Sequence, residues 1–383
     1  MKRFILYLTF IMAGVKIITN ETFHLLRRGK MTSKERIRNA VNHKTTDKLP
    51  KDFLATNFTM DKIKRELKLK NDEEVYRYFD CDVRSLDITK AYNGKPLKTY
   101  TKNGEIHEAT FWGYERKHHF TGTDYNMITT KFALDDDVDI NIALDKYTFP
   151  SADDFDYSQV LTFADEHPDK AICFGHAGAY QMSATNLRNT ELLFMDMALN
   201  TDGCHRLFDN MNNFLLDHYE KALEAGKGKV DILRIHDDYG TQISMLFSID
   251  MWKDYFMENL KKFVDLAHRY DAMLMQHSCG AIEPLIPYFI ECGVDILDPI
   301  QKVNGLEPKH IKNSYGNDVT FHGGIDTQFL LPSVTPDEVR KECSDYIDIL
   351  YKDGGYIFTG SQQIQSDVPM ENLIAMYETA KEY

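Results

Sequence analysis

The sequence predicts a single α/β domain that folds as a (β/α)8 (TIM) barrel. Short apolar runs rich in β-branched residues recur along the second half of the chain, and each precedes a loop and a helix-like segment. Strands that alternate with helices in this way form parallel β/α units, and eight such units close a barrel. No Pro/Ser-rich linker or internal repeat divides the chain of 383 residues. With two earlier candidates, the predicted strands are 51–55, 85–88, 171–174, 232–235, 273–275, 294–297, 319–321 and 356–358.

The predicted barrel domain covers residues 31–383. Thr32 and Glu35 form a capping-box pattern ahead of an amphipathic segment, which is typical of a helix start. Residues 1–30 differ from the rest because they hold six Lys or Arg, one Glu and an uncharged apolar run at 4–15. That run is shorter than the roughly 20 residues needed to span a bilayer, and no small-residue cleavage site follows it. We expect residues 1–30 to be a basic apolar leader outside the fold, with an export signal as the alternative.

Residues 92–165 break the β/α alternation and predict an insertion in the first half of the barrel. Asn103-Gly104 is a type I′ turn signal, and the alternating residues on both sides indicate a β-hairpin. Aromatic residues crowd the same region. They either pack the insertion against the barrel or form a lid over its mouth.

The helical segments of the second half follow from apolar spacing and helix-start chemistry. Residues 191–226 and 250–269 have apolar residues at helical spacing. The segment 335–351 opens with Thr335-Pro336-Asp337-Glu338, a favourable start for a helix.

Composition excludes several classes of function. A formal net charge of −14, from 45 Lys+Arg and 59 Asp+Glu, repels phosphate backbones, so we expect no nucleic-acid partner. The six cysteines follow no disulfide framework and form no CxxC pair, which is typical of a reducing compartment such as the cytoplasm. No apolar run is long enough for stable membrane insertion.

Candidate functional residues lie directly after the predicted strands, because the active site of such a barrel is built at the carboxyl ends of its strands. The polar residues found there include carboxylates, imidazoles, an amide, a thiol and a hydroxyl. They are His176, Asp237, Asp238, His277, Cys279, Gln301, Asp326 and Ser361.

His277 and Cys279 are the candidate metal ligands. Side chains two residues apart lie on the same side of an extended strand end, and zinc accepts both nitrogen and sulfur donors. Asp238 could act as a third ligand, orient His277 or serve as a general base. The alternatives are a packed cysteine beside a hydrogen-bonded histidine, and an Asp238 that only caps a helix. Of the adjacent pair Asp237-Asp238, at most one is expected to enter the site, because neighbours on a strand point to opposite sides.

Several of these segments, taken in order, resemble the uroporphyrinogen decarboxylase superfamily, and most closely its corrinoid-dependent methyltransferase branch. The resemblance implies a (β/α)8 barrel and zinc held by a His-x-Cys pair plus a later Cys. It also implies methyl transfer to or from a cobalt corrinoid on a separate protein. The segments are HDDYGTQ at 236–242, HSCGAI at 277–282, GVDILDPIQ at 293–301, GGID at 323–326 and DVPMEN at 367–372.

The resemblance to the decarboxylases themselves is weaker. Their arginine-rich stretch after the first strand, which grips substrate propionates, corresponds here to residues 51–58, which contain no arginine. Their tyrosine falls on Asn186 and their late Gly-His on Gly360-Ser361, although Asp87 matches their catalytic aspartate. The third zinc ligand of the methyltransferases also falls on Ser361, and a serine hydroxyl is a poor zinc ligand. Either Asp238 or another rim residue completes the site, or the metal is absent.

The sequence therefore predicts a zinc-assisted methyltransferase that moves a methyl group between a small methylated compound or thiol and a corrinoid protein. His277 and Cys279 would hold zinc, and Asp238 and Asp87 are the candidate catalytic residues. The enzyme alternative is a uroporphyrinogen-decarboxylase-like lyase centred on Asp87. The non-enzymatic alternative is a protein that binds a corrinoid or tetrapyrrole. The predicted substrate-binding residues are His176, Asp237, Gln301, Asp326 and Ser361.

Overall fold

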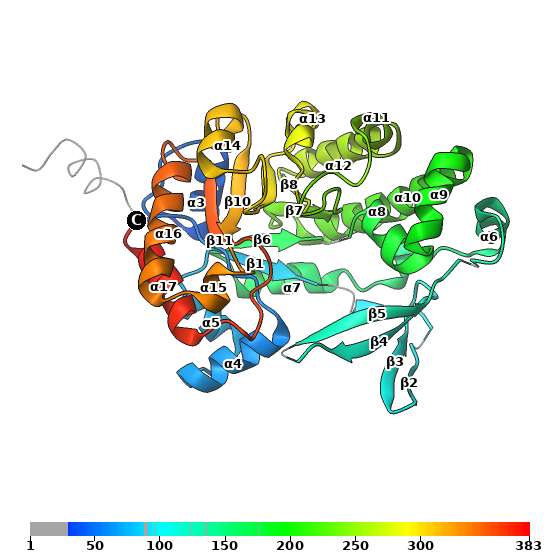
Figure 1. Ribbon diagram of the computed structural model, residues 1–383, viewed down its shortest axis with the longest axis horizontal. Helices are drawn as coiled ribbons and strands as arrows, with labels where there is room; N and C mark the ends of the chain where they lie inside the picture. The colour runs from blue at the N-terminus through cyan, green and yellow to red at the C-terminus, as the bar shows by residue number, and fades with distance from the viewer. Residues whose placement is uncertain (1–29, 88–90, 96, 123, 135, 176) are drawn as a thin grey trace, which may run out of the picture.

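A computed structural model describes residues 30–383 except 88–90, 96, 123, 135 and 176 (Figure 1). Residues 1–29 of the predicted leader thus lie outside the described part of the chain. The first described helix, α3 (Ser33–Val41), starts at the predicted capping box. The Thr32 hydroxyl accepts the backbone N–H of Glu35, and the Glu35 carboxylate accepts that of Thr32. This helix start is confirmed.

The centre of the fold is a curled parallel sheet of seven strands (Figure 1). The strands are hydrogen-bonded in the order β1-β6-β7-β8-β9-β10-β11, so each strand of this sheet lies beside the one that precedes it in the chain. Most of their residues are buried, which explains why they appear in the sequence as continuous apolar runs. The strands are β1 (Val83–Leu86), β6 (Ala171–Phe174), β7 (Ile232–His236), β8 (Met273–His277), β9 (Ile296–Ile300), β10 (Thr320–Ile325) and β11 (Tyr356–Gly360).

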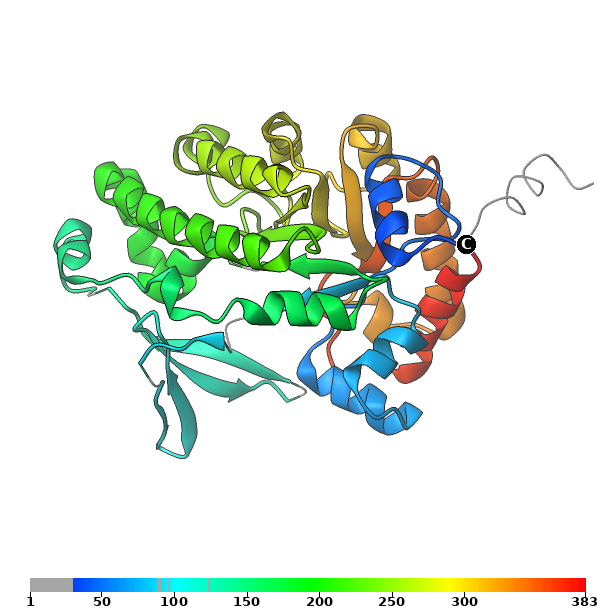
Figure 2. The ribbon, with the colours of Figure 1, turned by 180° about the vertical axis from the view of Figure 1, so that it is seen from behind.

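Helices cover the outer face of this sheet (Figure 2). The predicted start of α16 is confirmed, because Thr335 and Glu338 form a second capping box and Pro336 occupies the first helical turn. The covering helices are α7 (Ser158–Glu166), α10 (Thr201–Gly226), α12 (Glu258–Arg269), α13 (Ile286–Cys292), α14 (Pro308–Tyr315), α16 (Pro336–Leu350) and α17 (Met370–Lys381). Other helices lie in the connections: α4 (Asn57–Leu67), α5 (Asp72–Tyr78), α6 (Ile140–Lys146), α8 (Ala179–Met182), α9 (Thr190–Leu199), α11 (Ile249–Trp252) and α15 (Leu330–Ser333).

Apolar side chains fill the interior of the curled sheet at the amino ends of its strands. Ile37 of α3 packs there against the first residues of neighbouring strands, including Val83, Ala171 and Ile232. The helix therefore covers this end of the sheet, and the opposite end, where the strands finish, remains for polar side chains.

The predicted strand 51–55 is not a regular strand, and this corrects the prediction of eight. Its segment lies between β11 and β1: the N–H of Phe358 donates to the carbonyl of Pro50 at 2.9 Å, and the N–H of Asp82 to that of Lys51 at 2.7 Å. Carboxylates replace strand carbonyls here, because Asp82 accepts the N–H of Lys51 at 3.0 Å. The α/β class is confirmed, whereas the complete eight-stranded barrel is reduced to seven strands and this irregular segment.

A second sheet lies between β1 and β6 in the chain, within the region predicted as an insertion. It is antiparallel, with four strands in the order β2-β3-β4-β5. β2 and β3 pair across Asn103 and Gly104, whose φ angles of 53° and 81° are those required of a type I′ turn. The strands are β2 (Thr99–Lys102), β3 (Glu105–Ala109), β4 (Glu115–Phe120) and β5 (Tyr125–Lys131).

The turn between β4 and β5 reaches the rim of the parallel sheet beside α4. The buried carboxylate of Asp124 accepts the hydroxyl of Thr56 at 2.7 Å and the backbone N–H of Ser366 at 2.9 Å. The rings of Phe58 and Tyr125 are 5.3 Å apart at the same place. The four-stranded sheet is thus fastened to the loops that follow residues 51–55 and β11.

No helix in the described part of the chain is both long and apolar enough to cross a membrane.

Candidate metal centre

The site begins with two neighbouring strand ends. β7 and β8 pair in parallel register, so that His236 lies beside His277 and their ring centroids are 4.0 Å apart. Because side chains alternate along a strand, Arg234, His236 and Asp238 share one side of β7 and its extension. The register thereby brings His236 and His277, 41 positions apart in the sequence, to one point at the carboxyl end of the sheet.

Three of these side chains form a cluster suited to a metal ion. His236, Asp238 and His277 each offer a ligand atom, and these atoms all lie within 4.8 Å of one another. The Nε2 atoms of His236 and His277 are each 3.5 Å from an oxygen of Asp238. Two ligands of a tetrahedral zinc ion, bound at about 2.0–2.2 Å, are separated by roughly 3.3–3.6 Å. The donor types and their spacing therefore fit zinc.

Cys279 adjoins this cluster. Its Sγ lies 3.4 Å from Nε2 of His277, and the amide Nε2 of Gln362 donates to the same sulfur at 3.0 Å. The loop that carries the thiol is held in place, because the N–H of Cys279 donates to Asp238 at 2.9 Å and that of Gly280 to Gln301 at 2.6 Å. The structure thus brings together Cys279, His277 and Asp238, and Gln301 supports the loop.

The second nitrogen of His277 is engaged below the cluster. Its Nδ1 lies 2.7 Å from Oδ2 of Asp298, a carboxylate that also accepts Nε and Nη2 of Arg234 at 3.0 and 2.7 Å. Nη2 of Arg234 also lies 2.7 Å from this nitrogen, and the two contacts together turn Nε2 towards Asp238 and Cys279. Carboxylate partners of this kind orient metal-binding histidines.

The charges of the cluster shift the pKa values of its members. Burial raises the pKa of the Asp238 carboxyl, but the hydrogen bonds from His236 and His277 outweigh it and hold the pKa well below its usual range. Burial, together with the neighbouring His277, lowers the pKa of His236 to about 3. Burial also opposes the charge of His277, yet Asp298 and Asp238 raise its pKa well above the usual value. One ionised carboxylate and one neutral imidazole are therefore available as ligands.

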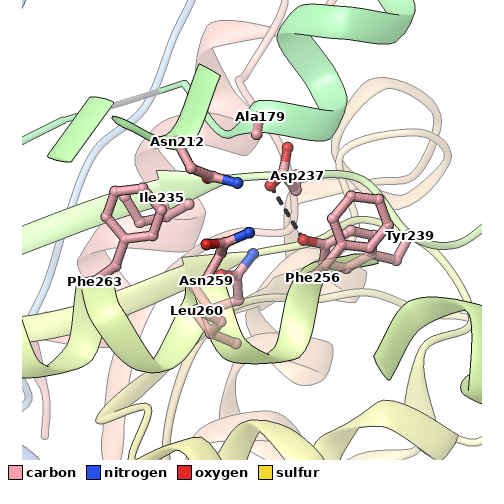
Figure 3. Close-up of a pocket in the computed structure, with 10 residues that line it drawn as sticks. Ala179, Asn212, Ile235, Asp237, Tyr239, Phe256, Asn259, Leu260 and Phe263 are labelled. Atoms are coloured by element: carbon pink, nitrogen blue, oxygen red, sulfur yellow. Dashed lines mark hydrogen bonds between the residues drawn. The ribbon is translucent and has the colours of Figure 1, made fainter. Parts of the chain in front are cut away.

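Asp237 faces away from this cluster. Its buried carboxylate accepts the N–H of Gln181 at 2.7 Å and the hydroxyl of Tyr239 at 3.1 Å, and burial raises its pKa to about 7. Figure 3 shows it in a small cavity between the sheet and two helices, α10 and α12. The cavity is lined by Ala179, Asn212, Ile235, Asp237, Tyr239, Phe256, Asn259, Leu260, Phe263 and Gln276. The alternation along β7 thus sends Asp238 to the cluster and Asp237 to the opposite side.

Three other predicted site residues, Asp326, Ser361 and Asp87, are not part of the cluster of His236, Asp238 and His277. The Asp326 carboxylate accepts backbone N–H groups of Gln328, at 2.8 Å, and of the two residues that follow, so it shapes the start of α15. Ser361 is buried, and its hydroxyl accepts the N–H of Thr327 at 3.4 Å. Asp87 is exposed directly after β1 and acts electrostatically on His218 of α10. His176 lies outside the described residues.

Sequence reasoning did not assign roles to His236, Arg234, Asp298 or Gln362. His236 could have been found, because it precedes Asp238 by two residues and shares its side of the strand. Gln362 is the neighbour of Ser361, the position at which the resemblance placed a ligand. The conformation of the loop after β11 decides which of the two side chains reaches Cys279, and that conformation has no local sequence signal.

The chain matches the family model described as "Uroporphyrinogen decarboxylase (URO-D)" over residues 153–383. A curated relative, the methylated-thiol–coenzyme M methyltransferase of Methanosarcina mazei, is 24% identical over 178 residues. That alignment covers 46% of this chain and 44% of the relative, so the chain matches less than half of the relative's length.

The solved structure of a methyltransferase from Methanosarcina mazei is similar over almost the whole chain. It superposes with a TM-score of 0.66 at 16% sequence identity, covering 92% of this chain and 99% of its own. At that identity the similarity shows a shared fold. The family match extends over more than half of the 383 residues and includes His236, Asp238 and His277. The predicted family is confirmed: the chain belongs to the uroporphyrinogen decarboxylase family.

Proposed function

We propose that the protein is a zinc-assisted methyltransferase that moves a methyl group between a small methylated compound or thiol and a corrinoid carried by a separate protein. The observation that supports this most is the cluster of His236, Asp238 and His277, with Cys279 adjoining it, at the carboxyl ends of β7 and β8. The curated relative is a methyltransferase, and so is the protein whose solved structure superposes with a TM-score of 0.66.

His277, Asp238, His236 and Cys279 are the residues that would hold zinc. A bound zinc ion would act as a Lewis acid and lower the pKa of a thiol in an open coordination position. A catalytic site needs such an open position, so we propose that three of the four residues bind at one time. The sulfur of Cys279 has a side-chain partner outside these four residues, because the amide of Gln362 donates to it.

The residues around the cluster would position the reacting groups. Asp298 keeps the Nε2 of His277 directed at the metal, and Gln301 fixes the loop of Cys279 through Gly280. The half-buried carboxylate of Asp238, whose pKa is held low, would supply negative charge to the ion and could accept a proton from an incoming thiol.

A thiol or methylated thiol is the substrate class we propose. The curated relative is named for methylated thiols and coenzyme M. All six cysteines of the present chain are free thiols, which supports a cytoplasmic location as part of the same proposal.

The metal can be tested without any substrate. Zinc per chain is measured in the purified protein and after addition of zinc chloride, for the wild type, His277→Ala and Cys279→Ala. His268→Ala is the matched control, because this exposed histidine pairs with Asp295 on the outer face, at 2.8 Å. We expect one zinc ion in the wild type and the control, and a loss in His277→Ala. A wild type that binds no zinc would overturn the proposal and favour the binding-protein alternative.

Methyl transfer is tested with methylcobalamin as the probe. The holoprotein should speed the loss of the methyl group to a small thiol, followed by absorbance, and His277→Ala should abolish the acceleration. Equal rates for the two proteins would contradict the proposed catalysis.

A further inference from the structure

A series of hydrogen-bonded, buried polar side chains continues from the candidate metal centre into the interior of the sheet. Oδ2 of Asp298 contacts Nδ1 of His277, and Oδ1 of the same carboxylate lies 2.7 Å from Nδ1 of His322 on β10. Nε2 of His322 then lies 3.1 Å from Oδ2 of Asp52. These four side chains are each at least 93% buried, so water does not compete for their hydrogen bonds.

The geometry fixes the direction of both hydrogen bonds of His322. Both carboxylates can only accept, so His322 must donate from both nitrogens, Nδ1 to Asp298 and Nε2 to Asp52. The doubly protonated ring carries a positive charge. Burial alone would lower the pKa of His322, but Asp298 outweighs it and raises the pKa to about 9.

The charges of these buried side chains also balance. Asp52 and Asp298 supply two negative charges, and Arg234 and the protonated His322 supply two positive ones. Asp298 is held on both of its oxygens, by Arg234 and His277 on one and by His322 on the other. A carboxylate held in this way cannot rotate away from His277.

We infer that His322 is a positioning residue of the metal centre, which acts on His277 through Asp298 and is itself anchored by Asp52. Asp52 belongs to the irregular segment between β11 and β1. The hydrogen bonds through His322 and Asp298 therefore connect this segment to His277 on β8. The inference rests on the proposed metal centre. His322 and Asp52 lie far along the sequence from the four proposed zinc ligands, so the sequence alone does not indicate this role.

Two substitutions separate the two ends of His322. In His322→Asn the side-chain amide can replace Nδ1 and keep the bond to Asp298 while losing Asp52. In His322→Gln the amide can replace Nε2 and keep Asp52 while leaving Asp298 without this donor. Loss of an outer partner of a metal ligand costs about 10–100-fold in metal affinity. His322 contacts that partner and not the ligand itself, so we expect a loss near the lower end of this range, about 10-fold, in His322→Gln and a smaller one in His322→Asn.

Zinc affinity is measured by competition with a chromogenic chelator, and thermal unfolding of each variant reports whether it is folded. The Nδ1–H proton of His277, assigned by its loss in His277→Ala, is followed by NMR with 15N-labelled histidine. We expect a downfield, slowly exchanging signal in the wild type that weakens in His322→Gln. A folded His322→Gln with wild-type zinc affinity and an unchanged signal would overturn the inference.

The failure of this inference can be told from that of the proposed function. If the wild type binds no zinc, the proposed function fails, while the NMR signal of the metal-free protein still decides whether His322 positions His277. If the wild type binds zinc and His322→Gln lowers only the unfolding temperature, His322 is purely structural and the inference fails alone.

Discussion

Nε2 of His277 lies 3.4 Å from Sγ of Cys279, two residues further along the chain. This spacing places both donors on one side of the end of β8. The same nitrogen is 3.5 Å from Oδ1 of Asp238, which follows the neighbouring strand β7. The pair that the sequence singles out, His277 and Cys279, is therefore part of a larger set of possible metal donors.

His236→Ala should weaken zinc binding. Its Nε2 lies 3.5 Å from Asp238 and its low pKa leaves the ring neutral, as a ligand must be. If His236 is a ligand, the loss should be at least the roughly 10–100-fold that an outer partner costs. Competition with a chelator measures it, with His205→Ala on the outer helix α10 as the control. Equal affinity in the wild type and His236→Ala would remove His236 from the ligand set.

Gly280→Ala should destabilise the fold and disturb the loop of Cys279. The φ angle of Gly280 is 91°, and a Cβ there would lie 2.4 Å from the backbone carbon of Gly240. Gly228 is the matched control, because its φ is 74° and a Cβ would meet nothing within 4 Å. Gly228→Ala should cost only the left-handed backbone penalty of about 1–2 kcal/mol. Urea unfolding compares the two, and a smaller loss in Gly280→Ala than in Gly228→Ala would contradict the predicted clash.

Asp124→Ala should release the four-stranded sheet from the rim. The buried carboxylate loses its bonds to Thr56 and Ser366, and each hydrogen bond to a charged group contributes about 1.5–3 kcal/mol. We expect faster amide hydrogen exchange in β4 and β5. Asp139→Ala removes a carboxylate that only caps α6, so it should leave this exchange unchanged. Unaltered exchange in Asp124→Ala would show that the turn is not held by this contact.

His218 should make the protein less stable as the pH falls from 6.5 towards 4. Burial lowers the pKa of this histidine to about 4, although Asp217 and Asp87 act in the opposite direction. Between these values the unfolded chain binds a proton that the folded chain does not. The free energy of unfolding therefore decreases as the pH decreases. The total is up to about 3 kcal/mol, from roughly 1.4 kcal/mol for each pKa unit.

Urea unfolding at several pH values tests this prediction with His218→Asn as the comparison. The amide can keep a hydrogen bond to Tyr157, whose hydroxyl lies 2.7 Å from Nδ1 of His218. We expect a flatter dependence of stability on pH in the variant. The same slope in both proteins would assign the acid sensitivity to other groups.

Local chemistry made much of the fold predictable. The helix starts at Thr32 and Thr335 were predictable because they depend on side chains that bond within one turn, and the predicted strand at 171–174 coincides with β6. The strand at 51–55 was predicted from its sequence but is irregular. The carboxylate of Asp52 accepts the N–H of Phe53, and that of Asp82 accepts the N–H of Lys51. Asp82 is 31 residues from Lys51, so its contact cannot be recognised in the local sequence.

The sequence alone determined the alternation of strands and helices, the family, and the pair His277 and Cys279, because these depend on residue types at short spacing. Only the tertiary structure decided that His236 joins the pair, that Asp237 turns away and that Asp298 links His277 to His322. These relationships depend on strand register and on the side of the sheet that each residue faces. A register shift of one residue would send the same side chains to the opposite face, so long-range packing fixes what the local pattern leaves open.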